Sequence, residues 1–270
     1  TALIDGLYRA GVDRVVLSPG SRSTPLVLAC EGQPGLRTWV QVDERCAGFF
    51  ALGLAKAERR PVALICTSGT AAANWYPAVV EASYGRVPLI LLTADRPPEL
   101  QDWGANQTID QVRMYGGHVR AFHGLPPADA SAAALRSLRA LAARAVEQSR
   151  WPLPGPVHIN VPFREPLVPT EKARPELTVE PANTPAVLHP VMQADAAAAT
   201  ALARRLSGRR GLIVCGNENY DRTFAHAVTR LAEALDCPIL ADPLSGLRCG
   251  PHDRSRILGR YDAFLRRRDF

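Results

Sequence analysis

Lysine is almost absent from this sequence. Lys56 and Lys172 are the only two, and arginine supplies the rest of the positive side-chain charge. The formal net charge is +6, but the arginines are scattered, apart from the run Arg266-Arg267-Arg268. A nucleic-acid-binding protein concentrates its basic residues in a stripe or an arm. We therefore expect an arginine-rich surface with a few anion-binding arginines, and no nucleic-acid partner.

Long apolar runs, a leader-like segment and paired cysteines are also lacking. No apolar run approaches the roughly 18 residues that span a bilayer, so we expect no membrane partner. The start of the sequence shows no signal-peptide pattern. The six cysteines form no CxxC pair and mostly lie in apolar contexts, which excludes a typical zinc site. Reduced, partly buried cysteines favour a cytoplasmic location.

Short apolar runs that alternate with helical patterns are what the sequence does contain. The hydrophobic fraction is 47% and the charged fraction 21%, as in a globular protein with a sizeable core. Continuous apolar strands indicate a parallel sheet that is covered by helices on both faces. The alternation predicts an α/β fold with a doubly wound, mostly parallel sheet. Expected strands are 15–17, 38–42, 62–66, 89–92 and 157–161, and expected helices are 24–30, 45–56, 71–83 and 131–148.

The domain organisation follows from a change in composition after the last of these strands. Residues 1–167 form the first predicted domain, and the proline-rich segment 168–190 reads as an extended linker. Residues 191–270 repeat the α/β pattern. Because we expect only two strands there, and two strands cannot bury a doubly wound core, this second α/β domain looks truncated. Its expected elements are helices at 195–206, 224–235 and 261–270, and strands at 211–215 and 238–241.

Four polar segments follow apolar runs in the first domain. Glu44 lies where an extended run gives way to a helix, and the other segments are 18–23, 67–70 and 93–99. The carboxyl ends of parallel strands meet at one edge of an open α/β sheet, which is where ligands bind. We therefore predict an active site for an anionic substrate or cofactor at this edge.

Glu44 has two interpretations. An acidic residue in the first turn of a helix stabilises the positive end of the helix dipole, and its position alone favours this structural role. A glutamate buried between the sheet and a ligand would instead have a raised pKa. It could then donate a proton near neutral pH.

Two of the other segments are tight turns that lead from a strand into a helix. In the first, Ser21 could cap the helix. Arg22 fits either the solvent-facing surface or a bidentate contact with a carboxylate or phosphate. The turn Thr67-Ser68-Gly69-Thr70 offers backbone N–H groups to an anion or to polar ring atoms, although cap-and-turn chemistry explains it equally well. It is not a P-loop, because the GxxxxGK[ST] pattern is absent.

Arg96 lies in a loop that two prolines make rigid. Gln107 belongs to the amide-rich stretch 104–108, which we expect near the same edge. Both are candidate substrate contacts.

Six segments, taken in order, resemble one enzyme family across nearly all of residues 1–167. It is the family of thiamine-diphosphate-dependent 2-succinyl-5-enolpyruvyl-6-hydroxy-3-cyclohexene-1-carboxylate synthases of menaquinone biosynthesis. The linker and second domain resemble the layout of the family's middle domain more weakly. The segments are SPGSRSTPL, DERCAGFFALGLAK, CTSGTAAANWYPAVVEA, LTADRPPEL, GANQTIDQ and GPVHINVPFREPL.

This resemblance implies a reaction and roles for the candidate residues. The family decarboxylates 2-oxoglutarate on thiamine diphosphate and adds the succinyl unit to isochorismate. Glu44 matches the glutamate that shares a proton with the pyrimidine ring of the cofactor. The 67–70 turn, which comprises Thr67, Ser68, Gly69 and Thr70, lies where relatives contact that ring. The positions that match substrate contacts of the family are Ser21, Arg22, Arg96 and Gln107.

Departures from the wider group of thiamine-dependent decarboxylases sharpen the resemblance. Asp43 replaces the histidine that many relatives carry before the glutamate, and Ser68-Gly69-Thr70 replaces a Gly-Pro-Gly turn. Both changes favour the menaquinone branch.

One absence limits what the chain can do by itself. In the family, a Gly-Asp-Gly motif in a C-terminal domain holds Mg²⁺ or Mn²⁺ with the diphosphate. This sequence has no such motif, so no residue here is assigned as a metal ligand. Relatives act as homodimers or homotetramers, and we expect the chain alone to be inactive. Two alternatives are another thiamine-dependent decarboxylase or synthase, and a non-enzymatic Rossmann-like binding module.

Overall fold

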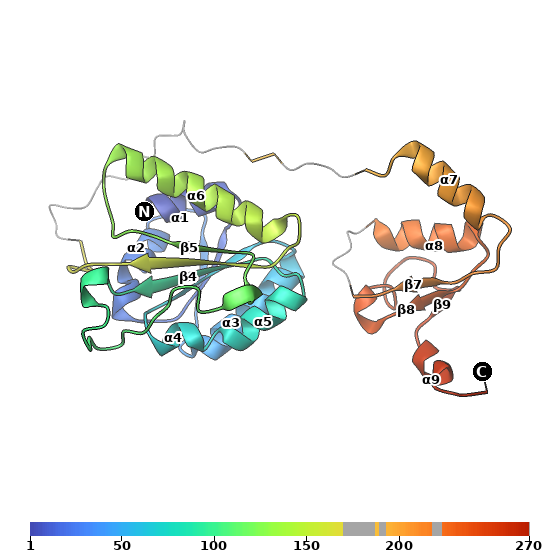
Figure 1. Cartoon of the computed structure of the whole chain (residues 1–270), viewed down its shortest axis with the longest axis horizontal. Coiled ribbons are helices and arrows are strands. Elements are labelled where there is room, and N and C mark those ends of the chain that lie inside the picture. The colour runs from blue at the N-terminus through green and yellow to red at the C-terminus, as the bar shows by residue number, and fades with distance from the viewer. Residues whose placement is uncertain (170–186, 189–192, 218–222, 270) are drawn as a thin grey trace. The chain divides into compact units, whose positions relative to one another are not determined.

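The structure is a computed structural model that describes residues 1–169, 187–188, 193–217 and 223–269 (Figure 1). The chain divides into two compact units, Thr1–His189 and Pro190–Phe270. Most of the predicted linker, 168–190, lies outside the described residues.

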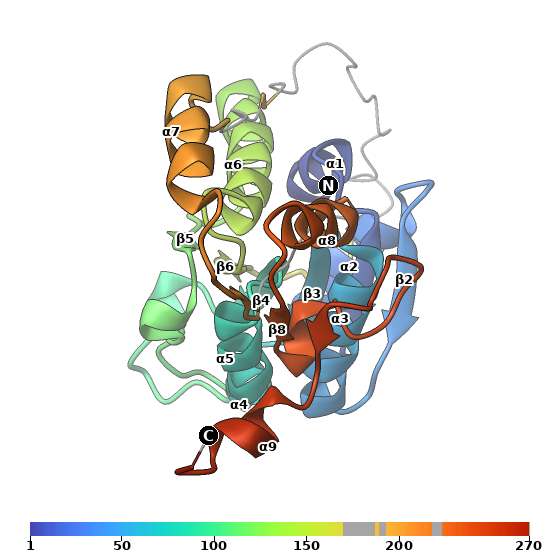
Figure 2. The same cartoon turned by 90° about the vertical axis from the view of Figure 1, so that its right-hand side faces the viewer.

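A six-stranded sheet organises the first unit, and all its pairings are parallel. The strand order is β2-β1-β3-β4-β6-β5, and Figure 2 shows β2 and β5 at opposite edges. The predicted α/β class with a parallel sheet is therefore confirmed. The strands are β1 (Arg14–Leu17), β2 (Arg37–Val40), β3 (Val62–Cys66), β4 (Leu89–Asp95), β5 (Ala121–Gly124) and β6 (Pro156–Pro162).

Helices cover both faces of this sheet (Figure 1). On one face lie α1 (Ala2–Arg9), α2 (Thr24–Glu31) and α6 (Ala132–Arg150), and their apolar side chains form one buried cluster with the sheet. On the other face lie α3 (Glu44–Glu58), α4 (Thr70–Ala73) and α5 (Tyr76–Tyr84), which form a second cluster. Two cores on opposite faces are what a doubly wound fold requires.

The central strands explain why this sheet forms. Every residue of β3, β4 and β6 is buried, so these strands bury side chains on both faces. Each fully buried Leu, Ile or Val contributes about 1.5–3 kcal/mol relative to an exposed one. β2 differs, because none of its four residues is fully buried. It lies at the sheet edge, where only one neighbouring strand pairs with it.

Several expectations about local structure need correction. The helix expected at 71–83 is split into α4 and α5 at Asn74 and Trp75, with a proline in the first turn of α5. The edge strand β5 was not expected at all. Cys46 and Cys249 are exposed, whereas the other four cysteines are buried; all six are free thiols.

The second unit contains a parallel sheet with the order β7-β8-β9. α8 packs on the sheet and supplies Val228 and Ala232 to a small core. The expectation of two strands was wrong, because β9 adds a third that is only two residues long. The elements are α7 (Ala196–Leu206), β7 (Ile213–Cys215), α8 (Phe224–Ala234), β8 (Ile239–Ala241), β9 (Ile257–Leu258) and α9 (Tyr261–Leu265).

The length and the composition of the helices decide whether any of them could cross a bilayer. Within the described parts of the chain, none combines the length and the apolar character that crossing a membrane needs.

Candidate active site

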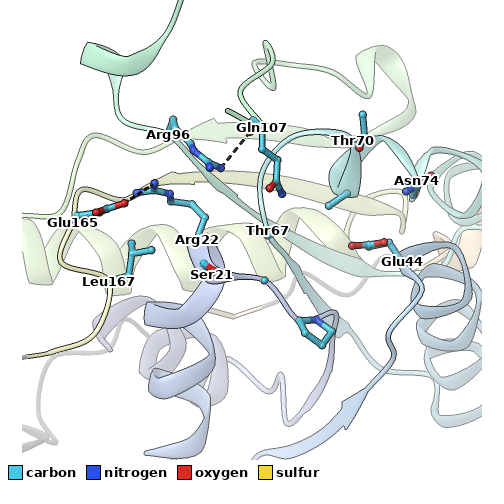
Figure 3. A pocket seen from close by; sticks show the side chains of 13 residues that line it. Ser21, Arg22, Glu44, Thr67, Thr70, Asn74, Arg96, Gln107, Glu165 and Leu167 are labelled. Carbon is cyan, nitrogen blue, oxygen red and sulfur yellow. Dashed lines mark hydrogen bonds and ion pairs between the residues drawn. The ribbon is translucent and has the colours of Figure 1, made fainter. Parts of the chain in front are cut away.

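A cavity of about 530 Å³ lies where the strand order of the first unit reverses. The chain passes from β1 outward to β2 and then returns to β3 on the other side of β1. The loops that follow β1 and β3 therefore diverge and leave a crevice, as is usual at such a switch point. The lining residues are Pro19, Gly20, Ser21, Arg22, Glu44, Thr67, Thr70, Ala71, Asn74, Arg96, Gln107, Glu165 and Leu167 (Figure 3).

The cavity brings together most of the residues that the sequence singled out. Ser68 and Gly69 are the exceptions, because both are buried and neither lines the cavity. The predicted residues that line it are Ser21, Arg22, Glu44, Thr67, Thr70, Arg96 and Gln107.

Glu44 enters this cavity from the first position of α3. Asp43 is the N-cap of the helix and accepts a hydrogen bond from the Arg45 backbone N–H at 2.8 Å. This cap fixes the start of the helix and so places the next side chain, Glu44, at the cavity wall (Figure 3). Glu44 is half-buried. Burial, and then the negative charge of Glu44, raise the pKa of the Cys66 thiol at the end of β3.

Asp43 has a different role from its neighbour. Its carboxylate forms an exposed ion pair with Arg45 at 2.6 Å. Hydrogen bonds from Arg45 lower the pKa of Asp43 to about 2. Because Asp43 does not line the cavity, the acidic group that faces the cavity from this helix start is that of Glu44.

Arg22 lies opposite Glu44 and is 93% buried, with a relative exposure of 7%. Its Nη1 donates to the Phe163 carbonyl at 3.0 Å, and its Nη2 donates to Oε1 of Glu165 at 3.2 Å. The Nε atom is buried and has no hydrogen-bond partner. A guanidinium held in this way keeps a fixed orientation at the cavity wall, which suits the binding of an anion.

Gly20 allows the Arg22 turn to approach the neighbouring loop. A Cβ atom at this position would lie 2.3 Å from Cβ of Thr67, which is far inside normal contact. The turns that follow β1 and β3 can therefore pack together only because Gly20 has no side chain.

Arg96 adds a second guanidinium at the same end of the cavity. Its Nη1 donates to Oγ of Ser68 and, at 3.2 Å, to the Gln107 carbonyl. Burial, and then the nearby positive charge of Arg22, lower the pKa of Arg96. Arginine nevertheless stays charged in proteins. The guanidinium groups of Arg22 and Arg96 repel each other at one end of the cavity, and this repulsion favours the binding of an anion there.

The turn at 67–70 is held by the loop that carries Gln107. Ser68 Oγ donates to the Gln107 carbonyl at 3.1 Å, and Gln107 Nε2 donates to the Ser68 carbonyl at 2.8 Å. Gly69 has a φ of 81°, which favours glycine, and a Cβ there would lie 2.8 Å from Cγ of Gln107. Ser68 and Gly69 thus support the cavity wall from behind, while Thr67 and Thr70 line it.

A buried hydrogen-bond network, which the sequence did not reveal, lies beneath this turn. Gln111 accepts from the Gly69 N–H at 2.7 Å and donates to Oδ1 of Asn160 at 2.9 Å. Asn160 donates to Oδ2 of Asp95 at 2.7 Å, and Thr93 donates to Oδ1 of Asn160 at 2.8 Å. The network connects the 67–70 turn to β4 and β6.

His158 completes the network in a neutral form. Its Nε2 lies 2.7 Å from Oγ1 of Thr93. Because the only hydroxyl proton of Thr93 goes to Asn160, Nε2 must carry the proton of the ring. Burial lowers the pKa of His158 to about 3, which agrees with a neutral imidazole.

Three further cavity residues escaped the sequence reasoning. Asn74 follows α4, and Glu165 and Leu167 follow β6. Glu165 lies in the loop after β6. Because β6 is parallel to the other strands, this loop leaves the sheet at the same edge as the other loops of the site. Its place directly after an apolar strand was the signal that could have identified it.

Metal ligands are not gathered anywhere in the described residues. No group of three or more His, Cys, Asp or Glu side chains among them could hold a metal ion.

The sequence of the chain is similar to those of known proteins. Residues 1–114 match the family described as thiamine pyrophosphate enzyme, N-terminal TPP binding domain. The matched residues include strands β1 to β4 and the loops after them that form most of the switch-point cavity.

Similarity to full-length proteins extends through both units. The chain is 55% identical over 98% of its length to 2-succinyl-5-enolpyruvyl-6-hydroxy-3-cyclohexene-1-carboxylate synthase of Geobacillus kaustophilus, of which it covers 46%. It is 51% identical over 99% of its length to the synthase of the same name from Dechloromonas aromatica, of which it covers 49%. Over nearly its whole length the chain is thus similar to synthases of this name, and it spans about half the length of the curated relatives it matches.

Proposed function

We propose that the intact protein is a thiamine-diphosphate-dependent transferase of menaquinone biosynthesis. It would decarboxylate 2-oxoglutarate and join the succinyl unit to isochorismate. The observation that carries this proposal is a cavity in which the carboxyl group of Glu44 lies opposite the guanidinium groups of Arg22 and Arg96. The names of the relatives support the choice of substrates.

The residues present fit the cofactor. When bound, thiamine diphosphate supplies the electron sink that decarboxylation of a 2-oxo acid requires. Glu44 would share a proton with a ring nitrogen of the bound pyrimidine. Thr67 and Thr70 line the cavity and would hold the ring, while Ser68 and Gly69 shape the turn that carries them.

The opposite end of the cavity binds the acidic substrates. Arg22 and Arg96 attract their carboxylates, and each charge-assisted hydrogen bond to a carboxylate contributes about 1.5–3 kcal/mol. Ser21 and Gln107 line the same end and offer a hydroxyl and an amide to the remaining oxygens. Glu165 offsets part of this positive charge through its contact with Arg22.

Further properties of the intact protein belong to this proposal. Mg²⁺ or Mn²⁺ would bind the diphosphate through ligands outside this chain, and the intact protein would be a homodimer or homotetramer. A cytoplasmic location is supported by the six free thiols.

The test uses the intact protein and follows the consumption of 2-oxoglutarate with and without isochorismate. We expect product formation only when both substrates are present. Turnover of another 2-oxo acid without isochorismate would instead identify a different thiamine-dependent enzyme. An intact protein without any such turnover would favour the binding-module alternative.

The role of Glu44 is tested by Glu44→Gln, with Glu58→Gln at the other end of α3 as the matched control. Removing a positioned proton donor lowers kcat by about 10²–10⁴-fold. Glu58 contacts Arg14 and does not line the cavity, so its variant should keep wild-type kcat. Cofactor affinity, measured by calorimetric titration, separates a loss of chemistry from a loss of binding. Unchanged kcat in Glu44→Gln would refute the assigned role.

The 270-residue chain by itself is expected to be inactive. The same assay on the isolated chain should show no product, since the metal and diphosphate ligands are expected elsewhere. Turnover by the isolated chain would contradict this expectation.

A further inference from the structure

A second pocket, in the second unit, lies at the carboxyl ends of two parallel strands. Its volume is about 330 Å³, and it is lined by Arg248, Arg254, Ile257, Gly259 and Arg260. β8 ends at Ala241 and β9 ends at Leu258, directly before the last two lining residues. This edge of a parallel sheet is where α/β folds bind ligands.

The lining of this pocket is positively charged and contains no acidic residue. Its charged residues are Arg248, Arg254 and Arg260. Arg248 is fixed in place, because its Nε donates to the Ala241 carbonyl at the end of β8 at 2.9 Å. Arg254 donates to the Arg248 carbonyl at a long distance of 3.4 Å.

The acidic residues near these arginines in the sequence have other partners. Asp242 accepts from the Leu244 N–H at 2.8 Å, and Asp253 accepts from the Ser255 N–H at 2.9 Å. Within the residues that the structure describes, no carboxylate pairs with any of the three pocket arginines.

The neighbouring Arg256 differs from the three pocket arginines in having an acidic partner. It forms an ion pair with Asp236 at 2.8 Å and does not line the pocket. The three pocket arginines therefore lack the compensating negative charge that Arg256 has.

Such an arrangement selects for an anion. Like charges around one pocket repel one another, and a bound anion converts this repulsion into attraction. The planar fork of a guanidinium matches the oxygens of a phosphate group. Since small-molecule sites range from about 300 to 1,000 Å³, a pocket of 330 Å³ suits a compact anion.

We propose that this arginine pocket, formed by Arg248, Arg254 and Arg260, is a second ligand site that binds a phosphate or pyrophosphate group. The group could be free or the terminal part of a larger molecule. This site is separate from the cavity of the first unit, because the two share no residue. The inference does not depend on the proposed transferase activity.

The test titrates inorganic phosphate and pyrophosphate into the intact protein and follows binding by calorimetry. The variants are Arg248→Gln, Arg254→Gln and Arg260→Gln, and Arg256→Gln is the matched control. Each pocket variant should weaken pyrophosphate binding at this site by roughly tenfold or more, whereas the control should bind like the wild type. Other anion sites of the intact protein are unchanged in all four variants, so they contribute equally.

Several outcomes would overturn the proposal. Equal pyrophosphate binding by the wild type and all three pocket variants would show that the pocket is not an anion site. Succinate binding as tightly as pyrophosphate would refute the assignment of a phosphate group. Arg254 and Arg260 are exposed, so their variants remain informative even if Arg248→Gln loses its contact with β8 and unfolds.

Discussion

Replacing Gln111 with leucine tests whether the buried network determines the shape of the candidate active site. Gln111 is 1% exposed and makes three hydrogen bonds, to the Gly69 N–H at 2.7 Å, Asn160 at 2.9 Å and the Ala94 carbonyl at 3.1 Å. Leucine fills a similar volume but can make none of them.

The expected cost follows from the groups left without partners. The Gly69 N–H is buried and would lose its acceptor, which costs about 1–3 kcal/mol. Asn160 keeps its bond from Thr93, but the Ala94 carbonyl loses its side-chain donor. Because the new leucine gains some apolar burial, we expect a net loss of about 2–4 kcal/mol in the free energy of unfolding.

The measurement is urea unfolding followed by tryptophan fluorescence. All four tryptophans lie in the first unit, so the signal reports the unit that contains the network. Gln148→Leu is the matched control, since Gln148 is half-buried and its amide oxygen lies 2.8 Å from His123. The control should lose at most about 1 kcal/mol. Equal losses in the two variants would refute the reasoning.

A second readout separates stability from function. If Gln111 positions the 67–70 turn, Gln111→Leu should weaken thiamine diphosphate binding in the intact protein under conditions where the variant is folded. Thr93→Val perturbs the same network without touching the Gly69 bond, so its cofactor affinity should stay near that of the wild type. Equal affinity in all three proteins would contradict the positioning role.

Three further predictions follow from single residues. Gly20→Ala should lower the free energy of unfolding, measured with urea, by about 1–3 kcal/mol, because the new Cβ would overlap Thr67. Gly53 lies in open space on α3, so Gly53→Ala should be neutral or stabilising. Equal effects of the two changes would contradict the steric argument. Burial holds the pKa of His158 at about 3, so as the pH falls the imidazole becomes protonated in the unfolded chain before it does in the folded one. The free energy of unfolding should therefore fall by up to about 1.4 kcal/mol per pH unit between about pH 6.5 and pH 3. His158→Gln should therefore show a shallower slope between pH 6 and 4.5, and parallel slopes would show that the imidazole does not resist protonation. Glu165→Gln should tighten 2-oxoglutarate binding to the intact protein, because its carboxylate no longer competes for the guanidinium; unchanged affinity in a calorimetric titration would argue against that competition.

The sequence identified the strands that are most deeply buried. β3 and the first half of β4 are continuous apolar segments that lie at the sheet centre, so hydrophobicity alone located them. β5 was missed because its four residues are only partly buried or exposed and include a histidine and a glycine. β9 was missed because two residues make too short a pattern. Edge strands and short strands form because of contacts with neighbouring strands, and the local sequence pattern does not contain this information.

The candidate site was predictable where its residues follow apolar strands. Arg22, Glu44 and Arg96 all met at one cavity, as the rule for parallel strand ends requires. The network beneath them was not predicted, because the partners of Gln111 are distant in sequence. His158 and Asn160 did give a signal, since two polar residues at a spacing of two within an apolar strand point to the same buried face.

The direction of the hydrogen bonds beneath the candidate active site sets a limit on proton movement. Thr93 and Gln111 both donate to the same oxygen of Asn160, so the two branches converge on an amide that cannot pass a proton onward. The buried imidazole of His158 is therefore insulated from the cavity. Protons that reach a ligand in the cavity must come from the side chains of the cavity wall or from solvent at the cavity opening. The hydrogen-bond network beneath the cavity has only a structural role.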